Sequence, residues 1–116
     1  MIRLKRAYDP PAPGDGLRVL VDRLWPHGVS KDSARIGLWL RDIAPSTALR
    51  KWFAHDPAKW TEFRRRYKAE LKQEPAKGAL AEVKRLAKEN KTVTLVFGAR
   101  DEERNQAAVI RGVAGK

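Results

Sequence analysis

Two clusters of charged side chains in this sequence follow apolar runs, and both could do chemistry. The first is Asp22-Arg23-Leu24-Trp25-Pro26-His27-Gly28, directly after the apolar run 17–21. A buried apolar run does not normally end in an acid and a base unless each is paired or functional. Arg23 could hold a phosphate or carboxylate through two hydrogen bonds, and Asp22 could orient Arg23 or take a proton.

Two further side chains of this cluster suit a ligand site. Trp25 offers a flat face for a base or another ring, and His27 has an intrinsic pKa suited to proton transfer. A purely structural reading of the same cluster is also open. Asp22 and Arg23 would then form an ion pair, Trp25 would belong to the core, and residues 26–28 would make a turn.

The second cluster is Gly98-Ala99-Arg100-Asp101-Glu102-Glu103-Arg104-Asn105. A strand, a tight turn and a helix N-terminus would together make an anion site here, although three acids in the turn would repel an anion. Asp101 is also a good residue to cap the following helix. Arg100 would pair with Asp22 or reach a ligand, and Asn105 could recognise a ligand edge.

In open α/β sheets, sites lie at the carboxyl ends of the strands, so we expect the two clusters to form one anion-binding site. The expected ligand is a nucleotide, a nucleic acid or another phosphorylated molecule. If the site is catalytic, its groups suit carboxylate acid–base or electrostatic phosphoester chemistry. The expected roles are anion binding by Arg23 and Arg100, orientation or proton transfer by Asp22 and Asp101, and ligand binding by Trp25, His27 and Asn105.

A basic helix face supports an alternative function. Arg64, Arg65 and Lys68 lie off the apolar stripe of their predicted helix, and they could contact nucleic acid without catalysis. The chain holds 25 Lys and Arg against 14 Asp and Glu, a net charge of +11, which favours anionic partners. The excess is spread over both halves of the chain, so a charge that merely keeps a structural or adaptor protein soluble is the third reading.

Several classes of protein are excluded or disfavoured. The chain has no cysteine, so disulfides, thiolate nucleophiles and iron–sulfur clusters are impossible. With two histidines we expect no metal site, and without a Walker or dinucleotide glycine pattern we expect no cofactor. No apolar stretch approaches the roughly 20 residues that span a bilayer. We therefore expect no membrane partner, and with no export signal we expect a cytoplasmic protein.

The elements that must position these residues follow from hydrophobic periodicity. We predict one α/β domain over residues 1–116, with three or four strands in a mostly parallel or mixed sheet and about four helices. Ser46 is favoured as a helix cap over a nucleophile, because no His or Lys adjoins it. The predicted strands fall within 2–8, 17–21, 36–40 and 92–97, and the predicted helices within 46–53, 57–71, 80–91 and 101–113.

Several of these segments resemble signatures of the YeaO-like family of small bacterial proteins, domain of unknown function 488. The two longest are RVLVDRLWPHGVSK at 18–31 and ARDEERNQA at 99–107, and the others are 38–46, 49–53 and 63–67. The resemblance covers nearly the whole chain. It implies a cytoplasmic α/β domain and does not by itself imply a function.

The chain departs from the family pattern at two places. The family often has arginine where His27 stands, which weakens a general-base role for His27. It often has histidines beside the asparagine of the last motif, where this chain has Arg104 and Gln106. More distant relatives carry cysteines in the corresponding strand-to-helix region, so thiolate chemistry does not carry over to this chain.

Overall fold

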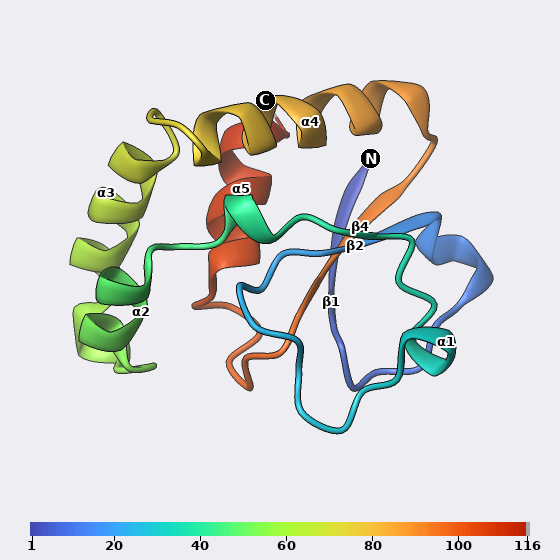
Figure 1. The fold of residues 1–116 in the computed structure, drawn as a ribbon, viewed down its shortest axis with the longest axis horizontal. Helices are drawn as coiled ribbons and strands as arrows, with labels where there is room; N and C mark the ends of the chain where they lie inside the picture. The colour runs from blue at the N-terminus through green and yellow to red at the C-terminus, as the bar shows by residue number, and fades with distance from the viewer. Residues whose placement is uncertain (116) are drawn as a thin grey trace.

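Four parallel strands form the centre of the protein, which is described here from a computed structural model of residues 1–115. The order across the sheet is β1-β4-β2-β3, and every neighbouring pair is parallel (Figure 1). This confirms the predicted α/β fold. The strands are β1 (Ile2–Arg6), β2 (Leu17–Leu20), β3 (Leu38–Trp39) and β4 (Val93–Phe97).

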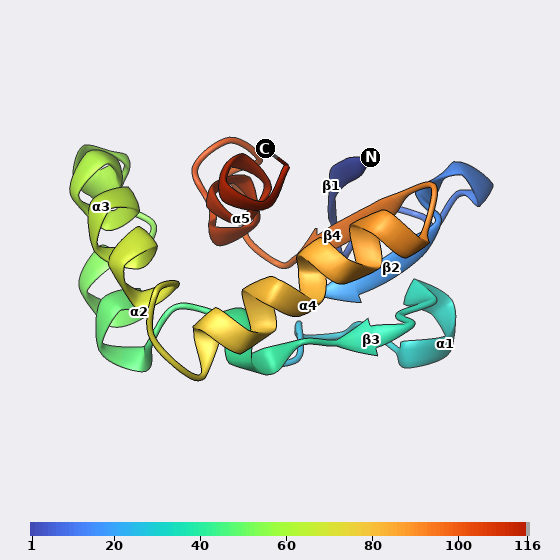
Figure 2. The same ribbon diagram turned by 90° about the horizontal axis from the view of Figure 1, so that it is seen from above.

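Residues 1–115 contain four helices of seven or more residues, the number predicted, together with one short helix. They are α1 (Lys31–Ala34), α2 (Thr47–Phe53), α3 (Trp60–Glu70), α4 (Ala76–Glu89) and α5 (Gln106–Ala114). Figure 2 shows α2 and α3 together at one end of the molecule, away from α1. None of these helices is long and apolar enough to cross a membrane, among the residues that the structure describes.

The two faces of the central strands pack against different layers, because side chains alternate along a strand. Val19 and Leu95 belong to the larger core, which includes the apolar faces of α2, α3, α4 and α5. Leu20 and Val96 belong to a smaller core on the other face, beside α1. All five residues of β4 are buried, as expected for a central strand of a parallel sheet.

A buried ion pair lies just before and within β2. The Arg18 guanidinium donates to the Asp15 carboxylate at 2.7 Å, and both side chains are almost fully buried. Asp15 also pairs with Lys5, which lies in the edge strand β1. The proline-rich segment 9–16, predicted as a loop, is thereby fastened to the sheet, and it contains one turn of 3-10 helix.

The start of the last helix differs from the sequence prediction. Asp101 was expected to cap it, but α5 begins at Gln106 and Asn105 is its N-cap. The Asn105 side chain accepts a hydrogen bond from the Ala108 N–H at 3.0 Å. The Asp101 carboxylate instead accepts the N–H groups of Glu103 and Arg104 at 2.9 Å, which closes a separate turn one helical turn earlier.

The predicted cap of the helix at 46–53 is confirmed. Ser46 caps α2, and its hydroxyl accepts the Leu49 N–H at 3.2 Å. The same hydroxyl donates to Glu70 of α3, so the cap also joins the two helices. Asp56 caps the short 3-10 turn Pro57–Lys59 that leads into α3.

Candidate functional site

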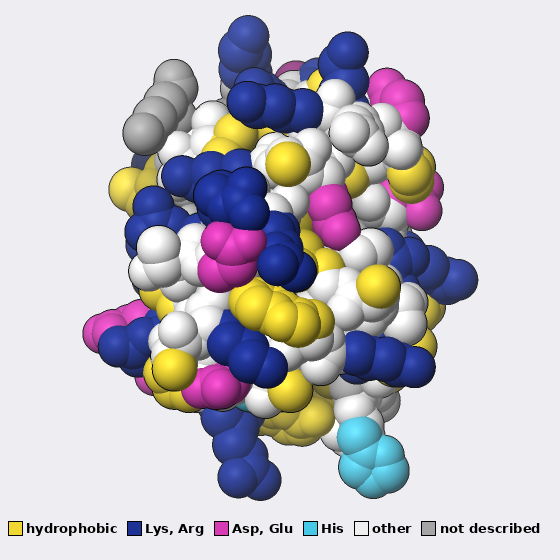
Figure 3. Space-filling model, turned by 90° about the vertical axis from the view of Figure 1, so that its left-hand side faces the viewer, with side chains coloured by type: hydrophobic (Ala, Val, Ile, Leu, Met, Phe, Trp, Pro, Cys, Tyr) yellow, Lys and Arg dark blue, Asp and Glu magenta, His cyan; other side chains and the backbone are white. Residues whose placement is uncertain are grey.

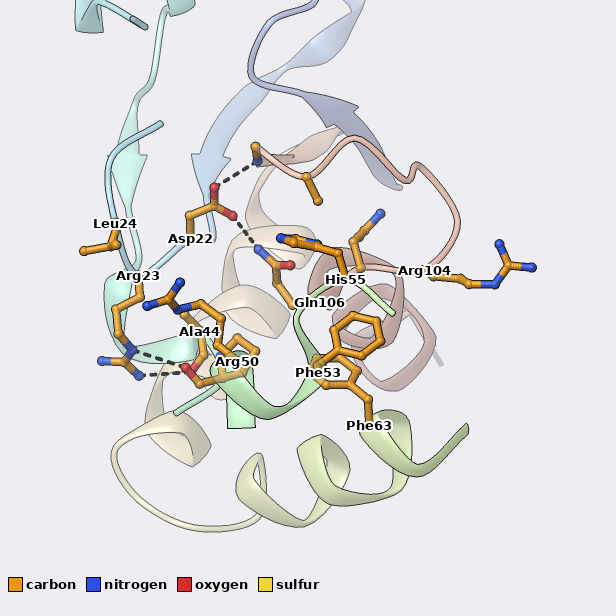
Figure 4. Close-up of a pocket in the computed structure, with 14 residues that line it drawn as sticks. Asp22, Arg23, Leu24, Ala44, Arg50, Phe53, His55, Phe63, Arg104 and Gln106 are labelled. Atoms are coloured by element: carbon orange, nitrogen blue, oxygen red, sulfur yellow. Dashed lines mark hydrogen bonds between the residues drawn. The ribbon is translucent and has the colours of Figure 1, made fainter. Parts of the chain in front are cut away.

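A pocket of about 200 Å³ lies at the carboxyl ends of β2 and β4, where α2, α3 and the N-terminus of α5 meet (Figure 4). Parallel strands place their carboxyl ends at one edge of the sheet, so residues far apart in sequence converge there. The pocket is lined by Asp22, Arg23, Leu24, Ala44, Pro45, Arg50, Phe53, His55, Phe63, Gly98, Ala99, Arg104, Asn105 and Gln106.

Asp22 is the only carboxylate of residues 1–115 in this lining, and it is partly buried. Its Oδ2 accepts the Gly98 N–H at 2.9 Å, and its Oδ1 accepts a hydrogen bond from the Gln106 amide. Burial raises the pKa of Asp22 to about 6, and these two hydrogen bonds offset only part of that effect. No Lys, Arg or His among residues 1–115 forms an ion pair with Asp22. The ionised Asp22 carboxylate therefore lowers the stability of the folded protein.

The Arg23 side chain is directed away from the Asp22 carboxylate. Its Nε donates to the Pro45 carbonyl and its Nη2 to the Ala44 carbonyl, each at 3.2 Å (Figure 4). The structural alternative in which Asp22 and Arg23 form an ion pair is therefore wrong within the described chain. A guanidinium has five N–H donors, so Arg23 keeps donors beyond the two that hold the Ala44–Pro45 segment.

Aromatic rings make the apolar wall of the pocket. Phe53 of α2 stacks on Phe63 of α3 with ring centroids 4.3 Å apart. Trp60 stacks on Phe63 in turn, at 5.7 Å. The two phenylalanines are nearly fully buried and belong to the larger core, so the wall is rigid.

Basic side chains from α2 and its C-terminal end complete the pocket. Figure 4 shows Arg50 extending from α2 toward the side where Arg23 lies. His55 follows α2 in a left-handed backbone conformation, with φ of 57°, and Ala54 before it has φ of 47°. Non-glycine residues adopt this region at a cost of about 1–2 kcal/mol each. The turn that brings His55 to the pocket is therefore a strained one.

Four residues of the second cluster, Gly98, Ala99, Arg104 and Asn105, line the pocket, and the side chains of Asn105 and Arg104 are each held by a polar contact. Asn105 is 2% exposed, and its amide donates to the Asp101 carbonyl while its oxygen caps α5. Arg104 borders the pocket, but Figure 4 shows its side chain directed away from the other labelled residues. Its guanidinium pairs with Asp101 at 3.4 Å.

The structure does not bring the other predicted site residues into this pocket. Trp25 packs in the smaller core, edge-on to Trp39 at 5.3 Å, and its indole N–H donates to the Val29 carbonyl. His27 and Arg100 are exposed, and Asp101 closes its own turn. The expected site is thus assembled in part, around Asp22, Arg23 and Asn105.

Six pocket residues with polar or aromatic side chains are not predicted as site residues from the sequence, and four of them lie on the long connection from β3 to β4. The sequence predicts Phe53 and Phe63 as core residues. They do belong to the larger core, and they also form part of the pocket wall. Nothing local marks Arg50 or His55 as pocket residues. Gln106 carried a weak signal, since it adjoins Asn105 in the last motif. The six are Arg50, Phe53, His55, Phe63, Arg104 and Gln106.

The alternative surface is exposed, as the sequence predicted. Arg64, Arg65 and Lys68 all lie on the outer side of α3. Figure 3 views the end of the molecule that carries α2 and α3, and many Lys and Arg side chains cover it, with acidic and hydrophobic side chains between them. In the described part of the chain no three His, Cys, Asp or Glu side chains come together in a way that could hold a metal ion.

The sheet and the pocket define an α/β protein with a candidate binding site at the carboxyl ends of parallel strands. Residues 1–114 match the family model described as the inactive DUF488-N3 subclade, so the chain belongs to this branch of the DUF488 family. It is 45% identical over 109 residues to the uncharacterised protein Rv3073c of Mycobacterium tuberculosis, covering 94% of this chain and 89% of that one. It is 40% identical over 111 residues to the uncharacterised protein YeaO of Escherichia coli, covering 94% and 92%. No solved structure matches the chain significantly.

Proposed function

We propose that this protein is a binding domain whose pocket takes a small phosphorylated molecule with a flat ring, of the nucleotide class. The observation that carries the proposal is a partly buried carboxylate, without a cationic partner among residues 1–115, in the same pocket as an arginine. Such a pocket has one end that accepts hydrogen bonds and another that attracts an anion, which suits a ligand with both features.

The polarity of the pocket sets the orientation of the ligand. An anion avoids the Asp22 carboxylate, so the phosphate would lie toward Arg50 and the remaining N–H groups of Arg23. The ring would lie against the aromatic wall of Phe53 and Phe63. An amino group on the ring would donate to Asp22 and to the side-chain Oε1 of Gln106, whose Nε2 already donates to Asp22.

The size of the pocket limits the ligand. At about 200 Å³ it is smaller than the roughly 300–1,000 Å³ of pockets that enclose drug-sized molecules. One ring system fits with one charged group at the mouth, so a mononucleotide is favoured over a dinucleotide.

Binding is favoured over catalysis by two features. The matched family model is described as an inactive subclade. Asp22 lines the pocket and Asp101 does not, so the two carboxylates proposed for acid–base work are not paired there. A cytoplasmic location remains part of the proposal, and fractionation of cells that express a tagged chain tests it.

Isothermal titration calorimetry with the four common nucleoside 5′-monophosphates, inorganic phosphate and ribose 5-phosphate tests this function. At least one nucleotide should bind more tightly than ribose 5-phosphate, because only the nucleotide places a ring on the aromatic wall. Arg50→Gln should weaken that binding about 10- to 100-fold, the usual loss for a hydrogen bond to a charged group. The matched control is Arg111→Gln, an exposed arginine of α5 outside the pocket lining. Equal loss in both variants, or no nucleotide binding, would overturn the proposal.

A further inference from the structure

The outer surface of α2 and α3 carries an excess of positive charge (Figure 3). Segment 47–70 holds seven Lys and Arg against three Asp and Glu. Six of the cations, with Trp52 between them, make up what we term the α2–α3 face. These cations are Lys51, Lys59, Arg64, Arg65, Arg66 and Lys68.

The acids of this segment neutralise little of the α2–α3 face. Glu62 is shared by Arg65 and Arg66, whose Nε atoms lie 2.9 and 2.8 Å from its carboxylate oxygens. These ionic contacts hold the pKa of the exposed Glu62 down at about 2, so the glutamate stays charged and cancels one of the two arginines. Asp56 and Glu70 form no ion pair with the cations of the face among the described residues, and their carboxylates instead accept hydrogen bonds from the backbone of the helix starts. About five positive charges remain available on the face.

Trp52 gives this face an aromatic element. The Arg66 guanidinium lies over the Trp52 ring at 4.4 Å, and the Lys59 ammonium lies 5.1 Å from the ring centre. The ring is partly buried against the larger core, so it is held in place. Cations interleaved with an aromatic ring are typical of surfaces that bind single-stranded nucleic acid, where phosphates meet the charges and bases meet the ring.

The pocket and the α2–α3 face share the same two helices. α2 contributes Arg50 and Phe53 to the pocket and Lys51 and Trp52 to the face, and α3 contributes Phe63 to the pocket beside the exposed Arg64. The pocket and the α2–α3 face are therefore built from neighbouring residues of the same two helices.

We infer that this protein binds a single-stranded nucleic acid, whose phosphates lie along the α2–α3 face while one nucleotide enters the pocket. The occupancy of the pocket rests on the function proposed above, whereas the backbone contacts rest on the face alone. The ligand class is thereby narrowed from a free nucleotide to a nucleotide within a strand.

Fluorescence anisotropy with labelled 12-nucleotide poly(U) and poly(dT) tests the inference across 50–200 mM salt. Five phosphate contacts to a single strand predict a log–log salt slope of about −3.5, a loss of about 100-fold over this range. Arg64→Gln with Lys68→Gln should reduce the slope to about −2.1 and weaken binding about 25-fold at 0.1 M salt. The matched control is Lys84→Gln with Lys88→Gln, two exposed lysines of α4. A flat salt response, or an equal loss in both double variants, would overturn the inference.

Competition separates this inference from the proposed function. A saturating nucleoside monophosphate should displace the oligonucleotide in part, and the α2–α3 double variant should bind that mononucleotide with unchanged affinity. If the oligonucleotide binds but no mononucleotide binds or competes, the pocket proposal fails and the face alone holds the strand. If a mononucleotide binds and the oligonucleotide binds no more tightly, the strand inference fails and the pocket proposal stands.

Discussion

Replacing Asp22 by asparagine should make the folded protein more stable at neutral pH. Burial raises the pKa of Asp22 from its ordinary value of 3.8 to about 6. A difference of about two pKa units corresponds to about 3 kcal/mol at 1.36 kcal/mol per unit. Asparagine keeps an oxygen for the Gly98 N–H, and the Gln106 amide can turn to accept from the new NH₂ group. We expect a gain of about 2–3 kcal/mol at pH 7.5, or about 8–12 °C in Tm.

The sign of the pH dependence follows from proton linkage. Between about pH 4 and pH 6 the folded protein holds a proton on Asp22 that the unfolded chain has released. Stability therefore falls as the pH rises through this window, and the full cost of the charge is present above pH 6. Below pH 4 the carboxyl is neutral in both states, so the Asp22→Asn variant and the wild type should then be equally stable.

Urea unfolding of the wild type and the Asp22→Asn variant at pH 4 and pH 7.5 measures the difference in their free energies of unfolding at each pH. The other titrating groups are the same in both proteins, so their contributions cancel in this difference. Asp101→Asn is the control with the opposite sign, because hydrogen bonds from the Arg104 and Glu103 N–H groups lower the pKa of Asp101. That variant should lose stability at neutral pH. An Asp22→Asn variant that is less stable than the wild type at pH 7.5, or equally shifted at both pH values, would refute the reasoning.

Two further substitutions test the packing around the site and the sheet. Gly98→Ala places a Cβ 2.9 Å from the Asp22 carboxylate, so we expect it to displace that side chain and weaken nucleotide binding in calorimetry while α5 still forms by circular dichroism. Arg18→Leu leaves the Asp15 carboxylate buried beside only Lys5, and breaking a buried pair costs about 3–5 kcal/mol. Urea unfolding measures that loss of stability. A change below about 1 kcal/mol would contradict the claim that the Arg18–Asp15 pair is buried and stabilises the fold.

The central part of the fold could be predicted from the sequence because its signals are local. The run 92–97 is apolar and rich in β-branched residues, and it is β4 at the centre of the sheet. The period of Trp60, Phe63 and Tyr67 predicts α3 correctly. The prediction that Asp101 caps the last helix is wrong, because a capping side chain looks the same in sequence whether it starts a helix or closes a turn.

The candidate site could be predicted only where its residues adjoin a strand end. Asp22 follows β2 directly, so its position at the edge of the sheet follows from the strand. Trp25 stands three residues later, and the chain has by then turned to the smaller core, where Trp39 packs against it. Arg50 and His55 reach the pocket through the path of the β3–β4 connection, which no local pattern encodes.

The most direct test of the central claim, a nucleotide pocket at the strand ends, is an NMR titration of the ¹⁵N-labelled protein with adenosine, guanosine, cytidine and uridine 5′-monophosphates. We predict that with at least one of them the largest shifts fall on the backbone amides of Gly98, Gln106 and residues 50–55, and saturate at one equivalent. Shifts spread over α4, or none at the pocket with any of the four, would contradict the account.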